Sequence, residues 1–186
     1  MKEIFDNFWV DIRKPPNIVT ATRLILSPLP GVMLLLGNNL TTHLYAAVLF
    51  GLIASTDMLD GFLARRLNMI TKLGAFMDPI VDKVLVGFVL LGLAAHDSKT
   101  VILLLFFIAY YCFVASIMKK IIKLGARIRP TVVGKVNMAC QDALMIVLIL
   151  PIPEKVQIFS TAFVVGMTFL SFISYQDRYS RIKKRP

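Results

Sequence analysis

Six apolar stretches of about twenty residues occupy most of this chain, and their length restricts how it can fold more than any other feature. A helix of about 20 apolar residues is long enough to cross the hydrocarbon layer of a membrane. Because lipid offers the backbone no hydrogen-bond partners, we expect helices that satisfy their own backbone groups. We therefore predict an all-α integral membrane protein of one domain, residues 1–186. Its six transmembrane helices are predicted at 18–37, 43–64, 73–95, 100–118, 132–152 and 156–175.

The positions of the basic residues support these six spans. If the N-terminus lies inside and the spans alternate, only Lys99 and Lys155 fall in outside loops, and Arg23 and Lys83 fall within spans. The remaining 17 of the 21 lysines and arginines then lie in inside segments. An excess of positive charge on inside loops is typical of membrane proteins. We therefore expect a protein of a bacterial-type cell membrane with both termini at the cytoplasmic face, where any site built on the inner ends of the spans would also lie.

The net charge of +10 is explained by this alternation, so we expect no nucleic-acid partner. Clustered positive charge on the inner side favours contact with anionic membrane lipids.

Before the first span, apolar residues recur at helical spacing over residues 1–14, with Trp9 among them. This pattern predicts a short amphipathic helix that lies in the membrane interface.

Four aspartates stand beside the apolar spans, where a charge is unfavourable. A charge at the centre of a bilayer costs roughly 2.5 to over 10 kcal/mol, depending on the scale. Asp57 and Asp60 are three residues apart near the inner end of the second span, and Asp78 and Asp82 are four apart near the start of the third. Each pair therefore shares one helix face. Because a short basic turn joins the two spans, we expect the two faces to meet.

Four carboxylates in a low dielectric repel one another unless cations lie among them. Clustered hard oxygen ligands suit Mg²⁺, Mn²⁺ or Ca²⁺, and Mg²⁺ binds carboxylates together with substrate phosphates. Gly61 and Gly74 allow a ligand or a backbone to come close, and the fork of donors on Arg65 suits phosphate oxygens. An ion-coupled transporter is an alternative, because carboxylates within membranes also mark ion pathways. Against it, these acids gather at one face with no matching acids deeper or outside.

The aspartates belong to a longer pattern, D-x-x-D-G-x-x-A-R-x8-G-x-x-x-D-x-x-x-D. It is complete here as Asp57, Asp60, Gly61, Ala64, Arg65, Gly74, Asp78 and Asp82. In this pattern, and in its length and spans, the chain resembles the CDP-alcohol phosphatidyltransferases, membrane enzymes of six helices. The resemblance implies transfer of a phosphatidyl group from CDP-diacylglycerol to a small or lipid alcohol, with release of CMP. It also implies a homodimer.

The resemblance assigns roles to the aspartates. Asp57 and Asp78 would bridge two divalent ions, Asp60 would hold one ion and Asp82 the other. We expect Mg²⁺, with Mn²⁺ as a substitute. Asp82 is also the position of the family's proposed general base. The chemistry agrees, because the attacking hydroxyl needs a base within hydrogen-bond reach, and His43 and His96 both fall on the far side of the membrane.

The same resemblance implies a site for the CDP-lipid. Two of its members, Asn17 and Thr20, lie at the start of the first span, and the others surround the aspartates. The full set is Asn17, Thr20, Gly61, Ala64, Arg65, Thr71 and Gly74.

The motif does not specify the alcohol that accepts the lipid. The segment "PPNIVTATRLILSPLP" and the stretch "GAFMDPIVDK" resemble the branch of the family that uses sn-glycerol 3-phosphate and makes phosphatidylglycerophosphate. Gly134, Lys135 and Gln141 also resemble that branch. Arg129, Lys135 and Arg178 are the candidates for binding the acceptor's phosphate.

Two features leave the acceptor open. The fourth span, "AYYCFVASIMKK", has no Arg-Glu pair of the kind that this branch usually carries. "RPTVVGKVNMACQ" is similar to the matching segment of cardiolipin synthases, which use CDP-diacylglycerol and phosphatidylglycerol.

Two polar residues of the fifth span, Gln141 and Asp142, are expected to face the bundle interior in hydrogen bonds rather than to bind metal.

Overall fold

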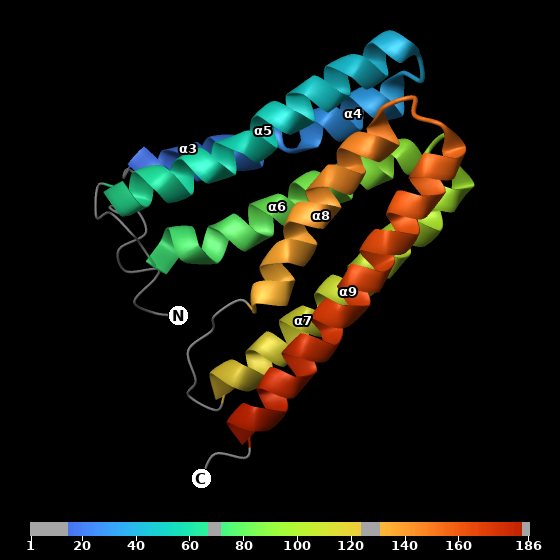
Figure 1. Ribbon diagram of the computed structural model, residues 1–186. Coiled ribbons are helices and arrows are strands. Elements are labelled where there is room, and N and C mark those ends of the chain that lie inside the picture. Colours follow the sequence, from blue (N-terminus) through green and yellow to red (C-terminus); the bar gives the residue numbers. More distant parts are fainter. Residues whose placement is uncertain (1–14, 67–71, 124–130, 184–186) are drawn as a thin grey trace. The chain divides into compact units, whose positions relative to one another are not determined.

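The computed structural model describes residues 15–66, 72–123 and 131–183. Helices cover nearly all of these residues, and no strand occurs among them (Figure 1). The prediction of an all-α chain is therefore confirmed. The helices are α3 (Pro15–Leu26), α4 (Pro28–Leu36), α5 (Leu40–Arg66), α6 (Lys72–Ala94), α7 (Ser98–Lys123), α8 (Val132–Ile149) and α9 (Glu154–Lys183).

Four helical stretches among the described residues are long and apolar enough to cross a membrane. They are Asn17–Leu36, Ser98–Ile121, Val132–Ile149 and Glu154–Lys183. A shorter apolar stretch, Leu40–Thr56, belongs to α5. An integral membrane protein is thus confirmed, whereas the count of six spans stays a prediction. The interfacial helix predicted over 1–14 lies outside the described residues.

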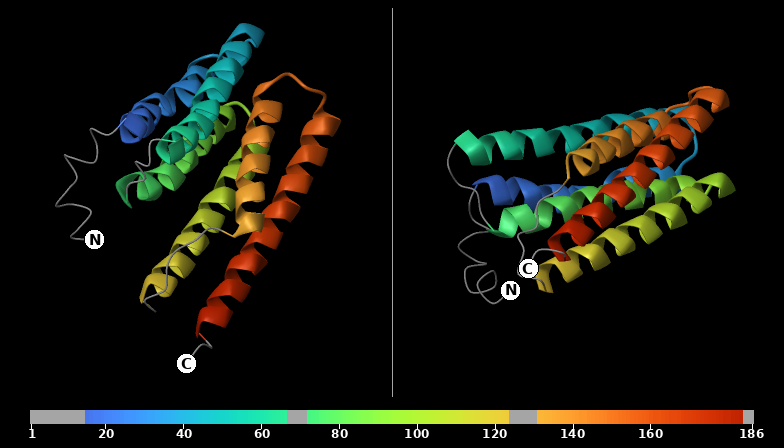
Figure 2. Two further views of the ribbon diagram at one scale, coloured as in Figure 1. Left: turned by 60° about the vertical axis from the view of Figure 1, so that its left-hand side comes forward. Right: turned by 60° about the horizontal axis from the view of Figure 1, so that its bottom comes forward.

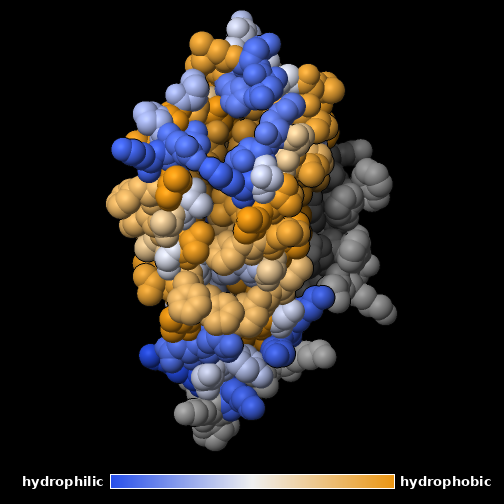
Figure 3. Space-filling view, turned by 90° about the vertical axis from the view of Figure 1, so that its right-hand side faces the viewer, coloured by the Kyte–Doolittle hydropathy of each residue, from blue (hydrophilic) through white to orange (hydrophobic). Residues whose placement is uncertain are grey.

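Large apolar side chains lie on the surface of these helices. Ile102 is 72% exposed and Phe159 is 75% exposed, and Leu105 on α7 is also exposed. Figure 3 shows an apolar zone between two hydrophilic zones on the face that it displays. Such a zone is the expected surface of a protein whose middle lies in hydrocarbon, because lipid tails solvate apolar side chains that water would not.

The chain divides into two compact units, Met1–Asp97 and Ser98–Pro186. In the first unit, α3 packs against α5 and α6, and α4 packs against the same two helices. In the second unit, α9 packs against α8 and α7, and it lies beside both in Figure 2. The assignment of residues 1–186 to one domain stays a prediction.

The first predicted span is broken into α3 and α4 at Ser27. Pro28 begins α4, and a second proline follows at Pro30. Proline lacks the backbone N–H that a continuous helix needs, so it bends or breaks helices. At the break, the backbone N and the Oγ of Ser27 both donate to the carbonyl oxygen of Arg23, at 2.8 and 2.6 Å. The end of α3 therefore keeps this carbonyl paired.

Glycines bring α4 and α6 into close contact. A Cβ placed on Gly31 would lie 2.1 Å from the carbonyl oxygen of Phe88, and one on Gly92 would lie 2.3 Å from the carbonyl oxygen of Gly31. Small residues allow the backbones of membrane helices to approach in this way. The contact holds α6, which carries Asp78 and Asp82, against the first span.

Replacing Gly92 by alanine should therefore destabilise the protein. The added methyl group forces the two backbones apart, and overpacking of this kind lowers the free energy of unfolding by about 1–3 kcal/mol. Thermal unfolding in detergent would show a lower Tm.

Gly87→Ala is the matched control on the same helix. Among the described residues, no atom lies within 4 Å of a Cβ at this position. Because alanine favours a helix over glycine by up to about 1 kcal/mol, the control should keep or raise its Tm. A Gly92→Ala protein as stable as this control would contradict the close contact.

Candidate active site

The two pairs of aspartates lie on two continuous helices of the first unit. Asp57 and Asp60 belong to the second half of α5, and Asp78 and Asp82 to the first half of α6. Residues three or four apart in a continuous helix share a face, so each pair keeps the predicted register. The structure describes the side chain of Asp82 but not those of the other three aspartates. The convergence of all four carboxylates therefore stays a prediction.

Several other predicted site residues also fall outside what the structure describes. Thr71 and Arg129 lie outside the described residues altogether. Four more belong to described helices, but their burial and contacts are not described: Gly61, Ala64 and Arg65 in α5, and Gly74 in α6. Among the described residues, no group of three or more acidic, histidine or cysteine side chains is placed to hold a metal ion. The ligand set therefore depends on the side chains that are not described.

One face of α3 is polar and buried. Asn17, Thr20, Arg23 and Ser27 recur at spacings of three and four residues, and each is 5% exposed or less. Residues at this spacing line a single helix face. Because α3 packs against α5 and α6, the polar face lies within the first unit. The predicted CDP-lipid residues Asn17 and Thr20 therefore share a buried face with Arg23.

Arg23 makes an ion pair with Asp82 across the unit. Its Nη2 donates to Asp82 Oδ1 at 2.6 Å. The Arg23 side chain is 3% exposed, whereas the Asp82 side chain is 24% exposed. A buried charge without a partner is strongly unfavourable, so this bond helps to stabilise the guanidinium inside the unit. The ion pair joins the helix face that carries Asn17 and Thr20 to the predicted base.

Sequence reasoning placed Arg23 within a span and gave it no role. Two signals could have identified it. Arg23 ends the P-N-x-x-T-x-x-R segment, in which Asn17, Thr20 and Arg23 follow one another at helical spacing. An arginine in a membrane span also requires a partner, and ionisable residues in such spans mark functional sites.

Both histidines lie far from the aspartates, His43 near the start of α5 and His96 in the turn after α6. His96 Nε2 lies 3.0 Å from the carbonyl oxygen of Leu34, and His43 Nε2 lies 3.0 Å from Asn38 Oδ1. From Asp82 to Ala94, the end of α6, the helix extends about 18 Å, and from His43 to Asp57 about 21 Å. Neither imidazole can exchange a proton with a group bound at the aspartates.

In the second unit, two of the three candidates for the acceptor's phosphate lie at one end. Lys135 is exposed in the first turn of α8, and Arg178 is half-buried one turn after Tyr175 in α9. A Cβ on Gly134 would lie 2.7 Å from the Tyr175 hydroxyl oxygen, so this glycine lets Tyr175 pack against the start of α8. Tyr175 also hydrogen bonds with Thr131. This packing brings the helix turns that carry Lys135 and Arg178 close together.

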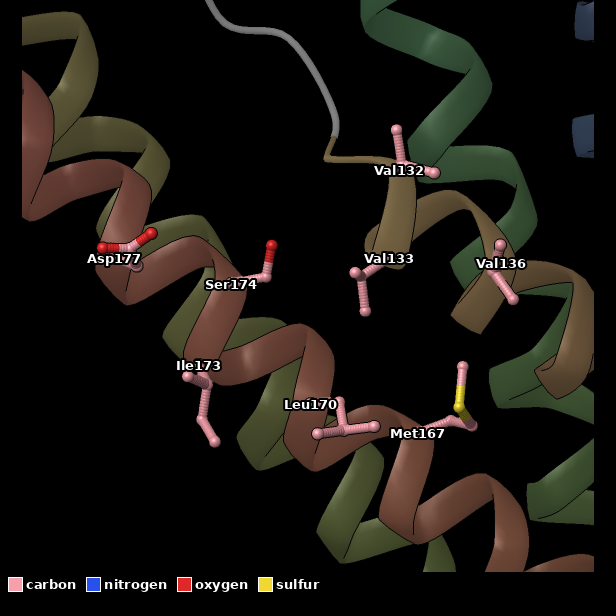
Figure 4. Close-up of a pocket in the computed structure, with 8 residues that line it drawn as sticks. All are labelled: Val132, Val133, Val136, Met167, Leu170, Ile173, Ser174 and Asp177. Atoms are coloured by element: carbon pink, nitrogen blue, oxygen red, sulfur yellow. The ribbon is translucent and has the colours of Figure 1, made fainter.

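An apolar groove runs between α8 and α9 at the same end (Figure 4). Its volume is about 540 Å³. Six apolar side chains line it, and the polar groups Ser174 and Asp177 lie toward the end of α9 that carries Arg178. Such a lining suits hydrocarbon better than a small charged molecule. The apolar side chains are Val132, Val133, Val136, Met167, Leu170 and Ile173.

Buried hydrogen bonds connect the three helices of the second unit. Tyr111 Oη donates to Gln141 Oε1 at 2.7 Å, and Thr168 Oγ1 donates to Asn137 Oδ1 at 3.0 Å. Gln141 Nε2 also donates to Thr168 Oγ1 at 3.4 Å. The expectation that Gln141 faces the interior in hydrogen bonds is thus met. Asp142, the next residue, is half-buried.

Replacing Asn137 by leucine should weaken this network. The change removes the acceptor of the Thr168 hydroxyl while keeping a similar side-chain volume. Hydrogen bonds between membrane helices contribute about 0.6 kcal/mol on average and up to about 1.7 kcal/mol, so we expect a loss of that size. Thermal unfolding in detergent measures it. Ser116→Ala is the control, because the Ser116 hydroxyl is exposed and bonds only to the Cys112 carbonyl of its own helix among the contacts described. Equal stability of the two variants would contradict a stabilising network.

Sequence similarity relates this chain to a family of known proteins. The sequence model of the CDP-alcohol phosphatidyltransferases matches residues 13–173. Three curated relatives carry the name CDP-diacylglycerol–glycerol-3-phosphate 3-phosphatidyltransferase. That of Rickettsia typhi is 39% identical over 83 residues, which are 45% of this chain and 46% of the relative. That of Aquifex aeolicus is 40% identical over 93 residues, half of each chain. That of Bacillus subtilis is 36% identical over 93 residues, 44% of this chain and 48% of the relative. The chain thus spans about half the length of the curated relatives it matches.

Proposed function

Because this chain belongs to the CDP-alcohol phosphatidyltransferase family, we propose that it transfers a phosphatidyl group from CDP-diacylglycerol to sn-glycerol 3-phosphate. The products are phosphatidylglycerophosphate and CMP. The observation that carries this proposal is the complete eight-residue pattern of the family, set on α5 and α6 of one compact unit. The names of the relatives support the choice of glycerol 3-phosphate as acceptor. Nothing in the family match supports the alternative of an ion-coupled transporter.

In the proposed reaction, the acceptor's hydroxyl oxygen attacks the phosphorus that carries the diacylglycerol. The bond from this phosphorus to the oxygen of CMP breaks, and the hydroxyl proton passes to the Asp82 carboxylate. Asp82 is suited to this role because its side chain is partly exposed while its ion-pair partner is buried. A base within hydrogen-bond reach of the proton contributes about 10²–10⁴-fold to the rate.

The four aspartates would hold two divalent ions. Asp57 and Asp78 would bridge both, with Asp60 on one ion and Asp82 on the other. Carboxylate oxygens are hard donors, which suit Mg²⁺ best and also accept Mn²⁺. When bound, the ions neutralise the charge that develops on the leaving diphosphate oxygen.

Other residues would bind the two substrates. Asn17 and Thr20 on the buried face of α3, with the residues around the aspartates, would bind the CDP group. Arg129, Lys135 and Arg178 would bind the acceptor's phosphate, and guanidinium forks suit this task. We further propose that both termini and the active site lie at the cytoplasmic face, and that the protein is a homodimer. The positive charge of the inside segments supports that orientation.

A second candidate function is cardiolipin synthesis, in which phosphatidylglycerol is the acceptor. The groove between α8 and α9 favours it, because this apolar surface lies near Arg178 and could hold the acyl chain of a lipid acceptor. Glycerol 3-phosphate has no hydrocarbon chain and would leave the groove to membrane lipid.

Release of CMP distinguishes these functions. The purified protein with CDP-diacylglycerol and Mg²⁺ should release CMP when glycerol 3-phosphate is added, and EDTA should stop the release. Phosphatidylglycerol and inositol phosphate serve as parallel acceptors. Release with phosphatidylglycerol alone would favour cardiolipin synthesis. No release with any of the three acceptors would contradict the proposed reaction.

Replacing Asp82 by asparagine tests the base. We expect kcat to fall about 10²–10⁴-fold, because the amide cannot accept the hydroxyl proton. Binding of CDP-diacylglycerol, measured by titration in detergent, should change little. Asp97→Asn is the control, since Asp97 is an exposed aspartate beyond the opposite end of α6. If Asp82→Asn turns over as fast as this control, Asp82 is not the base.

A further inference from the structure

The groove between α8 and α9 crosses the depth at which hydrocarbon gives way to lipid head groups. α9 begins at the charged Glu154, which must stay outside the hydrocarbon, and it has 30 residues. A hydrocarbon layer of about 30 Å takes about 20 residues of a helix, so it ends near Ser174. The wall of the groove from Met167 to Ile173 therefore lies in the hydrocarbon, and Asp177 lies at the level of the head groups.

The same face of α9 becomes basic beyond the groove. Four polar residues at spacings of three and four continue the wall of the groove towards the end of the helix. They are Ser174, Asp177, Arg178 and Arg181. The Nη2 of Arg181 lies 2.8 Å from Asp177 Oδ2, so the acidic group at the end of the groove is neutralised. A guanidinium has five N–H donors, and one bond to a carboxylate leaves others for a phosphate oxygen.

The apolar wall of the groove is accessible from the surface. Its residues Val132, Val136, Leu170 and Ile173 are each at least 46% exposed. A hydrocarbon chain in such a groove touches protein atoms of two helices. It therefore gains dispersion contacts that a chain on a single helix surface lacks. Figure 4 shows the two helices facing each other across this space.

An apolar groove that ends at a basic helix face matches one class of ligand. We propose that it binds an anionic phospholipid, with an acyl chain against the apolar wall and the phosphate beside Arg181. Residues 173–183 hold three basic side chains and one acidic side chain, so they favour an anionic head group over a zwitterionic one. This lipid is a membrane component that stays bound, and the proposal does not depend on the proposed reaction.

The test measures which lipid remains on the full chain in detergent. After incubation with equal amounts of phosphatidylglycerol and phosphatidylethanolamine, native mass spectrometry should show phosphatidylglycerol bound in preference. Leu170→Trp fills the groove and should remove most of the bound lipid. Leu105→Trp is the matched control on α7, because Leu170 is 54% exposed and Leu105 is 61% exposed. The control should retain lipid like the unchanged protein, and thermal unfolding shows whether each variant is folded.

The pair of Asp177 and Arg181 allows a second test, in which two changes act in opposite directions. Arg181→Gln removes a positive charge beside the phosphate, so the preference for phosphatidylglycerol should fall about fivefold. Asp177→Asn removes the negative charge at the end of the groove, so the preference should rise. Lys155→Gln changes an exposed charge at the opposite end of α9 and should leave the preference unchanged.

Three results would overturn the proposal. The first is equal lipid retention in folded Leu170→Trp and Leu105→Trp. The second is a preference that neither Arg181→Gln nor Asp177→Asn changes, or that both change in the same direction. The third concerns the fate of the bound lipid. Added CDP-diacylglycerol and Mg²⁺ should leave the bound phosphatidylglycerol unchanged, whereas its conversion to cardiolipin would make it a reactant.

These outcomes are separable from failure of the proposed function. A protein that releases no CMP with any acceptor contradicts the proposed reaction, but its lipid retention still tests the groove. An active protein that retains no phosphatidylglycerol overturns the lipid site alone.

Discussion

The ion pair between Arg23 and Asp82 is the contact on which the first unit depends. An arginine inside a membrane helix is unfavourable unless an anion lies against it, and here the anion comes from a helix distant in sequence. Once the pair forms, it fixes the position of α3 along the axis of α6. The polar face of α3 then lies against the helix that carries half of the predicted metal ligands.

The second unit follows a different principle, because its interior is held by neutral groups. Asn137, Gln141 and Thr168 satisfy one another between helices, and together with Tyr111 they form a buried network. Among the described residues of α8 and α9, the fully buried polar side chains are all neutral. The charges of this unit are placed differently: Lys135 is exposed in the first turn of α8, whereas Asp142 is half-buried in the middle of the same helix.

Much of the fold could be predicted from the sequence because span length is a physical constraint. Predicted spans and observed helices agree closely at 73–95, where α6 covers Lys72–Ala94. The last helix was predicted over 156–175 but extends over Glu154–Lys183. Hydropathy marks only the part that crosses hydrocarbon, whereas the helix continues through polar residues. The break at Ser27 was missed because counting apolar residues ignores the backbone donors that prolines remove.

The site could be predicted only where residues close together in the sequence determine its geometry. Asp78 and Asp82 are four residues apart, so the helical repeat alone predicts that they share one face. The partner of Asp82 lies 59 residues away, and no spacing rule connects Arg23 to it. Gln141 was correctly expected to face the interior, since an amide in a span needs partners. Which partners it has depends on how three helices pack.

The contact between Gly31 and Gly92 limits how the first unit can change shape. With each backbone against a carbonyl oxygen of the other helix, α4 and α6 cannot slide along each other without first separating. The two helices are therefore expected to behave as one rigid piece in any rearrangement of the first unit.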